Sequence, residues 1–119
     1  MNAQAQRYHD TGLELLAGAR AHLAEDDLRQ ASEKAWGAAA QMVKAAAEDR
    51  GWSHNSHHEL YAVINRLAGD IGDPQLRDLF ATAGSLHANF YEGWMPREMV
   101  ESSLGRVAEF VEKLDGQND

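Results

Sequence analysis

The side chains best suited to chemistry lie in two short stretches of the chain, and the first spans residues 50–60. It holds three histidines (His54, His57 and His58) together with Arg50 and Trp52, where one predicted helix ends and the next begins. A helix–helix connection needs only a glycine stop and a capping residue, so this one carries more functional groups than the fold requires. Imidazole titrates near neutral pH and a guanidinium can hold a phosphate. Spacing alone, an arginine and a histidine seven apart, is a weak signal.

The second stretch, residues 86–94, ends a later predicted helix. Its polar and aromatic members are, in order, His87, Asn89, Tyr91, Glu92 and Trp94. His87 lies on the apolar stripe of that helix, one turn after Ala83, where a lone histidine is more often a hydrogen-bonded core residue than a ligand. Asn89, Tyr91 and Glu92 can either satisfy its hydrogen bonds or line a pocket with it.

Two tryptophans, Trp52 and Trp94, each directly follow a glycine in a predicted connection. Tryptophan is unusual in such loops. The two rings either cover one end of the bundle or offer an aromatic floor for a base or an anchor for a protein partner.

A metal site would need three or four converging ligands, and His54, His57 or His58 with His87 and Glu92 could supply them. The chain has no His-Glu-x-x-His or other familiar zinc spacing, and no glycine-rich phosphate loop. We therefore expect neither a metal nor a cofactor, and keep a histidine–carboxylate metal site as an alternative.

The composition restricts the structural and functional classes to which this chain can belong. The chain has 119 residues, no cysteine and a formal net charge of −8, which excludes disulfide support, a thiolate nucleophile and a basic face that coats DNA. No run approaches the roughly 18 apolar residues of a membrane span, and no signal-peptide core opens the chain. We expect a single cytoplasmic domain over residues 1–119, with no membrane association.

Apolar residues repeat at helical spacing almost throughout, and no segment alternates with period two. Five helices are predicted, roughly over residues 3–25, 27–50, 56–71, 74–92 and 96–114, with residues 116–119 as a disordered tail. Asp27, Ser56 and Asp73 are the expected N-caps, Glu59 completes a capping box, and Gly51 is a stop. The fold class is all-α, an antiparallel up-and-down bundle of four to five helices.

Simple up-and-down connectivity would bring the two stretches of functional side chains, residues 50–60 and 86–94, close together. The second helix would end, the third begin and the fourth return at one end of the bundle. Both stretches would then meet there, joined by residues 7–9 and by Arg97 with Glu98.

Three segments carry a resemblance to a known family. Residues 35–46 form a helix of small residues, followed by a glycine, a histidine-containing link and a leucine-rich helix from Glu59. Residues 86–92 precede a last helix that closes on residues 110–114. Over roughly residues 31–114 the chain resembles the HEPN (higher eukaryotes and prokaryotes nucleotide-binding) superfamily, particularly its small prokaryotic members.

The resemblance implies an antiparallel bundle that is usually a homodimer. Many HEPN proteins are metal-independent RNases with an Arg-x4–6-His motif, often toxins or defence proteins beside a nucleotidyltransferase-like partner, and others bind nucleotides or proteins. Here Gly84 or Ser85 stands where the family's arginine is expected and Asn89 stands near its histidine. The Arg50-x6-His57 match lies in an earlier connection.

These observations favour a HEPN-like dimeric module, non-catalytic or weakly catalytic, that binds a nucleotide, an RNA end or a protein partner such as a nucleotidyltransferase-like antitoxin. The expected binding residues are Trp52, His54, His58, Asn89, Tyr91, Glu92 and Trp94. The alternative is a metal-independent endoribonuclease of a toxin–antitoxin or defence system. In that enzyme His57 or His87 would be the acid or base in attack by the RNA 2′-hydroxyl, and Arg50 would stabilise the phosphate.

Overall fold

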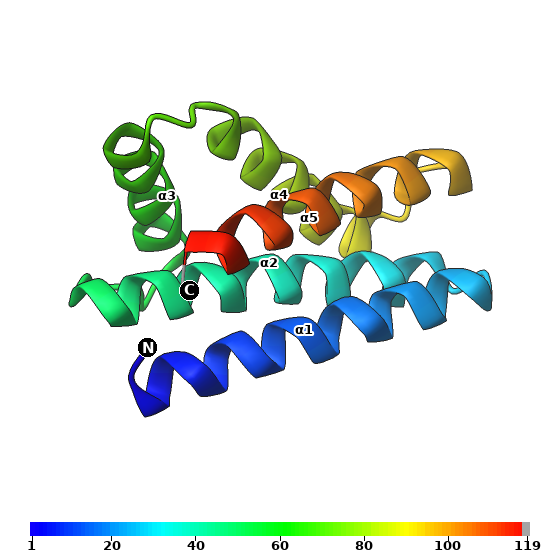
Figure 1. Ribbon diagram of the computed structural model, residues 1–119. Coiled ribbons are helices and arrows are strands. Elements are labelled where there is room, and N and C mark those ends of the chain that lie inside the picture. The colour runs from blue at the N-terminus through cyan, green and yellow to red at the C-terminus, as the bar shows by residue number, and fades with distance from the viewer. Residues whose placement is uncertain (118–119) are drawn as a thin grey trace.

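The computed structural model describes residues 1–117, which contain five α-helices and no strand. The helices are α1 (Ala3–Ala24), α2 (Leu28–Arg50), α3 (His57–Ile71), α4 (Gln75–Glu92) and α5 (Arg97–Gln117). The predicted all-α bundle is confirmed (Figure 1). None of these helices combines the length and the apolar character needed to cross a membrane.

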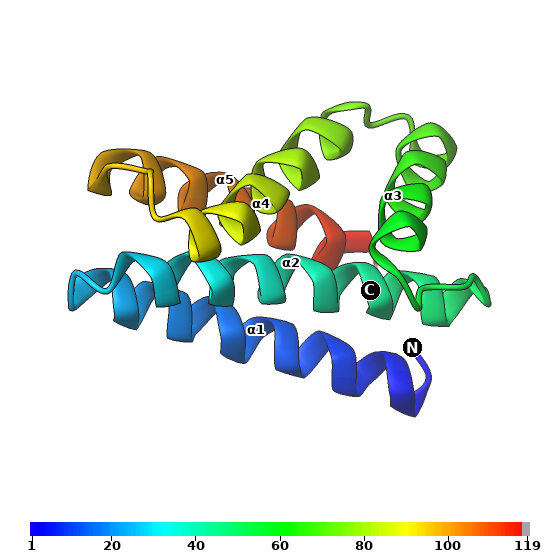
Figure 2. The same ribbon diagram turned by 180° about the vertical axis from the view of Figure 1, so that it is seen from behind.

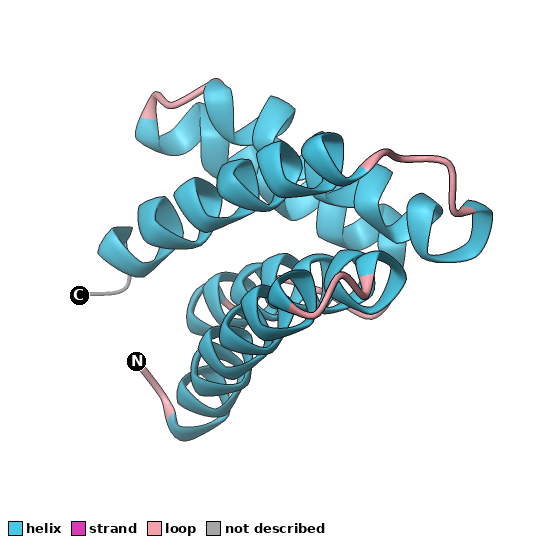
Figure 3. Ribbon diagram, turned by 90° about the vertical axis from the view of Figure 1, so that its right-hand side faces the viewer, coloured by secondary structure: helices cyan, strands magenta, loops and turns pink. Residues whose placement is uncertain are grey.

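Helix α2 is the central element, with α1 on one side and α4 and α5 on the other (Figures 1 and 3). Most of its buried side chains are alanines, so neighbouring backbones approach closely. At the tightest point a Cβ added to Gly12 of α1 would lie 3.0 Å from Sδ of Met42. Glycine at position 12 therefore permits the α1–α2 contact.

Helix α3 stands across the C-terminal half of α2 instead of running along it (Figures 1 and 2). The next helix, α4, consequently runs back toward the α1–α2 turn and not toward the end where α2 stops. Arg97, the first residue of α5, donates to the carbonyl of Leu23 at 2.9 Å and to the carboxylate of Asp26 at 2.7 Å, both at that turn. The expectation that both chemical stretches gather at one end of the bundle is wrong, because α3 does not run the length of the bundle. The stretches meet only in part, through His57 and His87, whose ring centroids lie 5.3 Å apart beside Trp36 in the middle of α2.

The chain start and the end of α5 do meet at the other end of the molecule, where Nε2 of His9 lies 2.5 Å from the carboxylate of Asp115. Burial lowers the pKa of His9, but its hydrogen bonds to Asp115 and Asp10 outweigh that effect and raise the pKa above the ordinary value. This contact links α1 to α5.

Most of the predicted helix boundaries are observed. Asp27 accepts a hydrogen bond from the Gln30 N–H and Ser56 from the Glu59 N–H, while Gly51 adopts a left-handed φ of 72° after α2. Asp73 is not an N-cap: α4 begins after Pro74 with no side-chain cap, and the Asp73 carboxylate lies 2.9 Å from Nζ of Lys113. The carboxylate of Asp73 therefore pairs with the ammonium group of Lys113 on α5 and does not cap α4. Residues 116 and 117 are helical, and residues 118–119 of the expected tail lie outside the described residues.

Asn89 is a buried polar link between three parts of the chain. Its Nδ2 donates to the Ser32 hydroxyl on α2 at 3.0 Å, and its Oδ1 accepts from the Met95 N–H at 2.9 Å. The Ser32 hydroxyl in turn donates to the Leu28 carbonyl. Asn89 thus provides a hydrogen-bond acceptor for a buried backbone N–H of the α4–α5 connection and holds α4 against α2.

Replacing Asn89 by alanine leaves the Met95 N–H buried without an acceptor. We expect Asn89→Ala to lower the free energy of unfolding by about 1–3 kcal/mol, measured by urea denaturation. The matched control is Asn55→Ala, whose side chain is exposed and whose loss is expected within about 0.5 kcal/mol. Equal effects of the two substitutions would contradict the structural role of Asn89.

Candidate functional site

Four aromatic side chains from three helices form a ring cluster: Trp36 of α2, His57 of α3, and His87 and Tyr91 of α4. The ring centroids of His57 and His87 lie 5.2 Å each from that of Trp36, and 5.3 Å from each other. Tyr91 meets His87 edge-on at 5.4 Å. The link of residues 51–56 runs back along α2 from Arg50, so that α3 begins beside Trp36, where α4 also packs.

The ring cluster is anchored in the core and open at the surface. The Trp36 indole is 6% exposed and stacks on Phe80 at 5.3 Å, and Phe80 stacks on Phe110 at 5.4 Å. His57 and Tyr91 are exposed, and the His87 side chain is 28% exposed. A rigid base therefore presents imidazole rings to solvent.

A carboxylate orients one of the two imidazoles. Nδ1 of His87 lies 2.9 Å from Oε1 of Glu33 on α2. Because a carboxylate accepts hydrogen bonds, Nδ1 carries the proton and Nε2 is the acceptor nitrogen when the ring is neutral. His87 is thereby held in one orientation beside His57.

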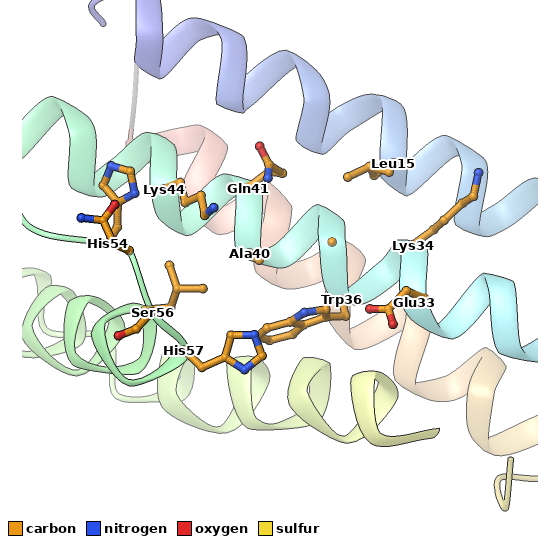
Figure 4. A pocket seen from close by; sticks show the side chains of 13 residues that line it. Leu15, Glu33, Lys34, Trp36, Ala40, Gln41, Lys44, His54, Ser56 and His57 are labelled. Carbon is orange, nitrogen blue, oxygen red and sulfur yellow. The ribbon is translucent and has the colours of Figure 1, made fainter. Parts of the chain in front are cut away.

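A groove of about 420 Å³ begins at the ring cluster and follows α2 between α1 and the start of α3. Figure 4 shows His57 beside Trp36, with Lys44 and His54 further along toward the C-terminal end of α2. The polar residues of its lining are Glu33, Lys34, Gln41, Lys44, His54, Asn55, Ser56 and His57. The groove thus combines an aromatic end with two lysine side chains.

His54 closes the far part of this groove. Its Nε2 lies 2.8 Å from the Glu48 carboxylate, and its ring packs edge-on against Tyr8 at 5.5 Å. Nζ of Lys44 lies 5.8 Å from the centroid of the Tyr8 ring. The beginning of α1 therefore joins the site through Tyr8.

The loop that carries His54 is held by Glu59. The carboxylate accepts from the Ser53 hydroxyl at 2.6 Å and from the Asn55 N–H at 2.7 Å. These two hydrogen bonds, the Ser53 one foremost, lower the pKa of Glu59 below its ordinary value. Glu59 thus braces the loop from inside the first turn of α3.

The structure separates Arg50 from both histidines of the predicted catalytic set. Arg50 donates to the Ala46 carbonyl at 2.9 Å and lies 5.8 Å from the Trp52 ring centroid. It follows Trp36 on α2 by fourteen residues, which is about 21 Å at the helical rise. His57, packed against Trp36, is beyond the reach of the Arg50 side chain, so the Arg-x6-His pair is not assembled within one chain.

The other predicted binding residues have separate surroundings. Trp52 lies under the Arg66 guanidinium, 4.1 Å from its ring centroid, and Asn89 is buried in the structural link described above. His58 and Glu92 are exposed and do not line the groove, and Trp94 is 52% exposed at the opposite end from Trp52. Of the predicted set, His54, His57, His87 and Tyr91 belong to the groove or the ring cluster.

Sequence reasoning missed the α2 contribution, chiefly Glu33, Trp36 and Lys44. A signal was present, since residues 33, 36, 37, 40, 41 and 44 recur at helical spacing and therefore share one face. A tryptophan that shares a helix face with polar residues, in a helix whose other face is rich in alanine, indicates a face that is not fully packed against neighbouring helices.

Across residues 1–117, no three histidine, aspartate or glutamate side chains lie close enough together to hold a metal ion. His87 with Glu33 and His54 with Glu48 are separate pairs. The arrangement offers aromatic stacking, hydrogen bonding and proton transfer.

Comparison with known proteins gives a family and a fold. The model of the archaeal PaREP1/PaREP8 family matches residues 7–111. A crystal structure of a Sulfolobus solfataricus protein is similar over 100% of this chain and 99% of its own, with a TM-score of 0.73 and 17% identity. A search of curated proteins gives no match. At that identity the structural likeness bears on the fold alone.

The geometry of the ring cluster predicts energetic coupling between its histidines. In a double-mutant cycle by urea denaturation, His57→Ala and His87→Ala should be non-additive by about 0.5 kcal/mol or more, because the rings are in contact. The matched cycle with Arg50→Ala and His57→Ala should be additive within about 0.5 kcal/mol. The reverse pattern would contradict the placement of His57 against Trp36.

Proposed function

This chain belongs to the archaeal PaREP1/PaREP8 family, and we propose that it is a HEPN-like module that binds a nucleotide or the end of an RNA chain in the groove beside Trp36. The observation that carries this proposal is the ring cluster at the mouth of the groove. Exposed His57 and Tyr91 can stack on a base, as aromatic side chains do in single-strand binding sites.

The charges of the groove support the same ligand. Lys34 and Lys44 line it within a protein of net charge −8. A lysine ammonium is a compact partner for phosphate, and an acidic surface elsewhere repels the rest of a long nucleic acid. This combination favours a short segment or a chain end over general coating of RNA.

The size of the groove fits a small ligand. Its volume of about 420 Å³ lies within the range of about 300–1,000 Å³ usual for small-molecule sites. The Glu33 carboxylate at the aromatic end can hydrogen-bond the edge of a base, and the Gln41 amide lines the groove further along toward Lys44 (Figure 4). Stacking and edge recognition would therefore act at the same position.

The HEPN assignment rests on the small-residue helix 35–46, the histidine-containing link and the late segment 86–92. It is supported by the five-helix all-α architecture. The resemblance also implies a homodimer, which we include in the proposal and which sedimentation equilibrium of the purified protein tests directly.

Binding is tested by titrating the protein with AMP and with a 5′-phosphorylated RNA oligonucleotide in isothermal titration calorimetry. Loss of one stacked base contact costs about 1–3 kcal/mol, so His57→Ala should weaken binding by about fivefold or more. Lys44→Gln should weaken binding and reduce its dependence on salt.

The matched controls change neighbouring or similar groups outside the groove. His58→Ala removes the adjacent exposed imidazole, and Arg106→Gln removes an exposed cation of α5. Both should leave binding unchanged. No binding of either ligand by the folded protein, or equal losses in His57→Ala and His58→Ala, would refute the proposed site.

A second candidate function, metal-independent RNA cleavage, is favoured by one specific observation. Two imidazoles lie 5.3 Å apart by their ring centroids, and Glu33 orients one of them. One neutral imidazole can accept the proton of the RNA 2′-hydroxyl as it attacks phosphorus, while an imidazolium protonates the departing 5′-oxygen. The position of Arg50 leaves this pair without the arginine of the family motif.

Cleavage of a labelled mixed-sequence RNA in excess EDTA separates the two functions. For the binding module we expect intact RNA with wild type, His57→Ala and His87→Ala alike. Cleavage by wild type that survives chelation and is lost in either histidine variant, with circular dichroism unchanged, would establish the ribonuclease instead.

A further inference from the structure

The α4–α5 connection and the first turn of α5 each expose one large apolar side chain at the end of the molecule opposite the C-terminus of α2. Trp94 is 52% exposed and Met99 is 51% exposed, while Met95 between them is buried and bonded to Asn89. The backbone of this corner is therefore fixed while Trp94 and Met99 face solvent. Tryptophan and methionine are enriched at protein interfaces, and a pre-ordered anchor loses little entropy on binding.

The α1–α2 turn lies directly beside this corner. Arg97 joins the two through the Leu23 carbonyl and the Asp26 carboxylate. The Arg29 guanidinium packs against Gly93, at a spot that a side chain on residue 93 would occupy. Residues 25–29 and 92–101 therefore form one continuous surface, which we call the corner surface.

The corner surface is strongly acidic around its apolar pair. It contains six carboxylates, namely Glu25, Asp26, Asp27, Glu92, Glu98 and Glu101, against the two arginines Arg29 and Arg97. This difference of four accounts for half of the net charge of −8.

Both arginines of the corner surface are already engaged within it. Arg97 pairs with Asp26 at 2.7 Å, and Arg29 covers the turn at Gly93. Asp27 lies 3.6 Å from Nδ1 of His22, and Glu101 lies 4.0 Å from Nε of Arg97. Among the described residues, the carboxylates of Glu25, Glu92 and Glu98 have no ion-pair partner, so these are the ones available to a partner protein. Charge of this sign repels a second copy of the same acidic surface and repels nucleic acid, whereas it attracts lysine and arginine.

We propose that the corner surface docks a lysine- or arginine-rich segment of a protein partner, with Trp94 and Met99 seated between apolar side chains of that segment. This site is separate from the groove beside Trp36 and does not depend on its ligand. Electrostatic attraction speeds and orients the encounter, and the Trp94 anchor supplies most of the affinity.

The test uses a synthetic amphipathic peptide of lysine and leucine, about 14 residues long so that it can form a helix, and a matched peptide with glutamate in place of lysine. Binding to the full chain is measured by calorimetry and mapped by amide chemical shifts. We expect the lysine peptide to shift residues 25–29 and 92–101, and the glutamate peptide not to bind. Trp94→Ala should weaken binding by about tenfold or more.

Two matched controls separate a specific site from general attraction. Leu13→Ala removes an exposed apolar side chain of α1, and Glu14→Gln with Glu112→Gln removes two exposed charges elsewhere. Both should leave affinity near wild type, whereas Glu98→Gln with Glu101→Gln should weaken it, and so should raising salt from about 0.1 M to about 1 M.

Four results would each overturn the proposal. The first is an equal affinity of Trp94→Ala and wild type, and the second is equal effects of the two glutamine pairs. The third is a wild-type dimer that Trp94→Ala dissociates, which would identify a second copy as the occupant. Chemical shifts at Trp36 and His57 on adding the peptide would likewise place the peptide in the groove and not at the corner.

Discussion

Close packing around the alanine-rich helix α2 is the constraint on which the rest of the molecule depends. Small side chains let α1 approach on one side, to the point where Gly12 accommodates Met42, and let α4 and α5 pack on the other. Trp36 is the one large aromatic side chain of this helix. Its indole stacks on Phe80, which in turn stacks on Phe110, and the two imidazoles pack against the indole. The candidate site is thus an extension of the core, and its rigidity derives from that core.

The crosswise course of α3 determines the direction of α4, and with it the positions of His87 and of the α4–α5 corner. The link of residues 51–56 places His57 beside Trp36, and the crosswise α3 then directs α4 toward the α1–α2 turn, so that His87 lies next to His57. The same direction of α4 places the α4–α5 corner next to the α1–α2 turn, where Arg97 reaches Asp26. This link and one short helix thereby create both a histidine pair at mid-bundle and an acidic surface at one end.

The groove beside Trp36 and the corner surface differ in the sign of their charge. The groove contains Lys34 and Lys44, while the corner surface holds six carboxylates around Trp94 and Met99. Ligands of opposite sign would therefore be sorted to different parts of a small protein, since attraction and repulsion act over about a Debye length of 8–10 Å at moderate salt. A net charge of −8 describes neither surface by itself.

Local patterns in the sequence determined the elements: apolar spacing, Ser56 and Asp27 as caps, and Gly51 as a stop, because these interactions lie within a few residues of one another. They also singled out His54, His57, His87 and Tyr91, which lie in the groove or in the ring cluster. Only the tertiary structure decided that Arg50 lies far from His57, that Asn89 is a buried structural link and that Asp73 pairs with Lys113. Those outcomes depend on the angle at which α3 crosses α2, which is set by side-chain packing between segments distant in sequence, and no local pattern encodes that angle.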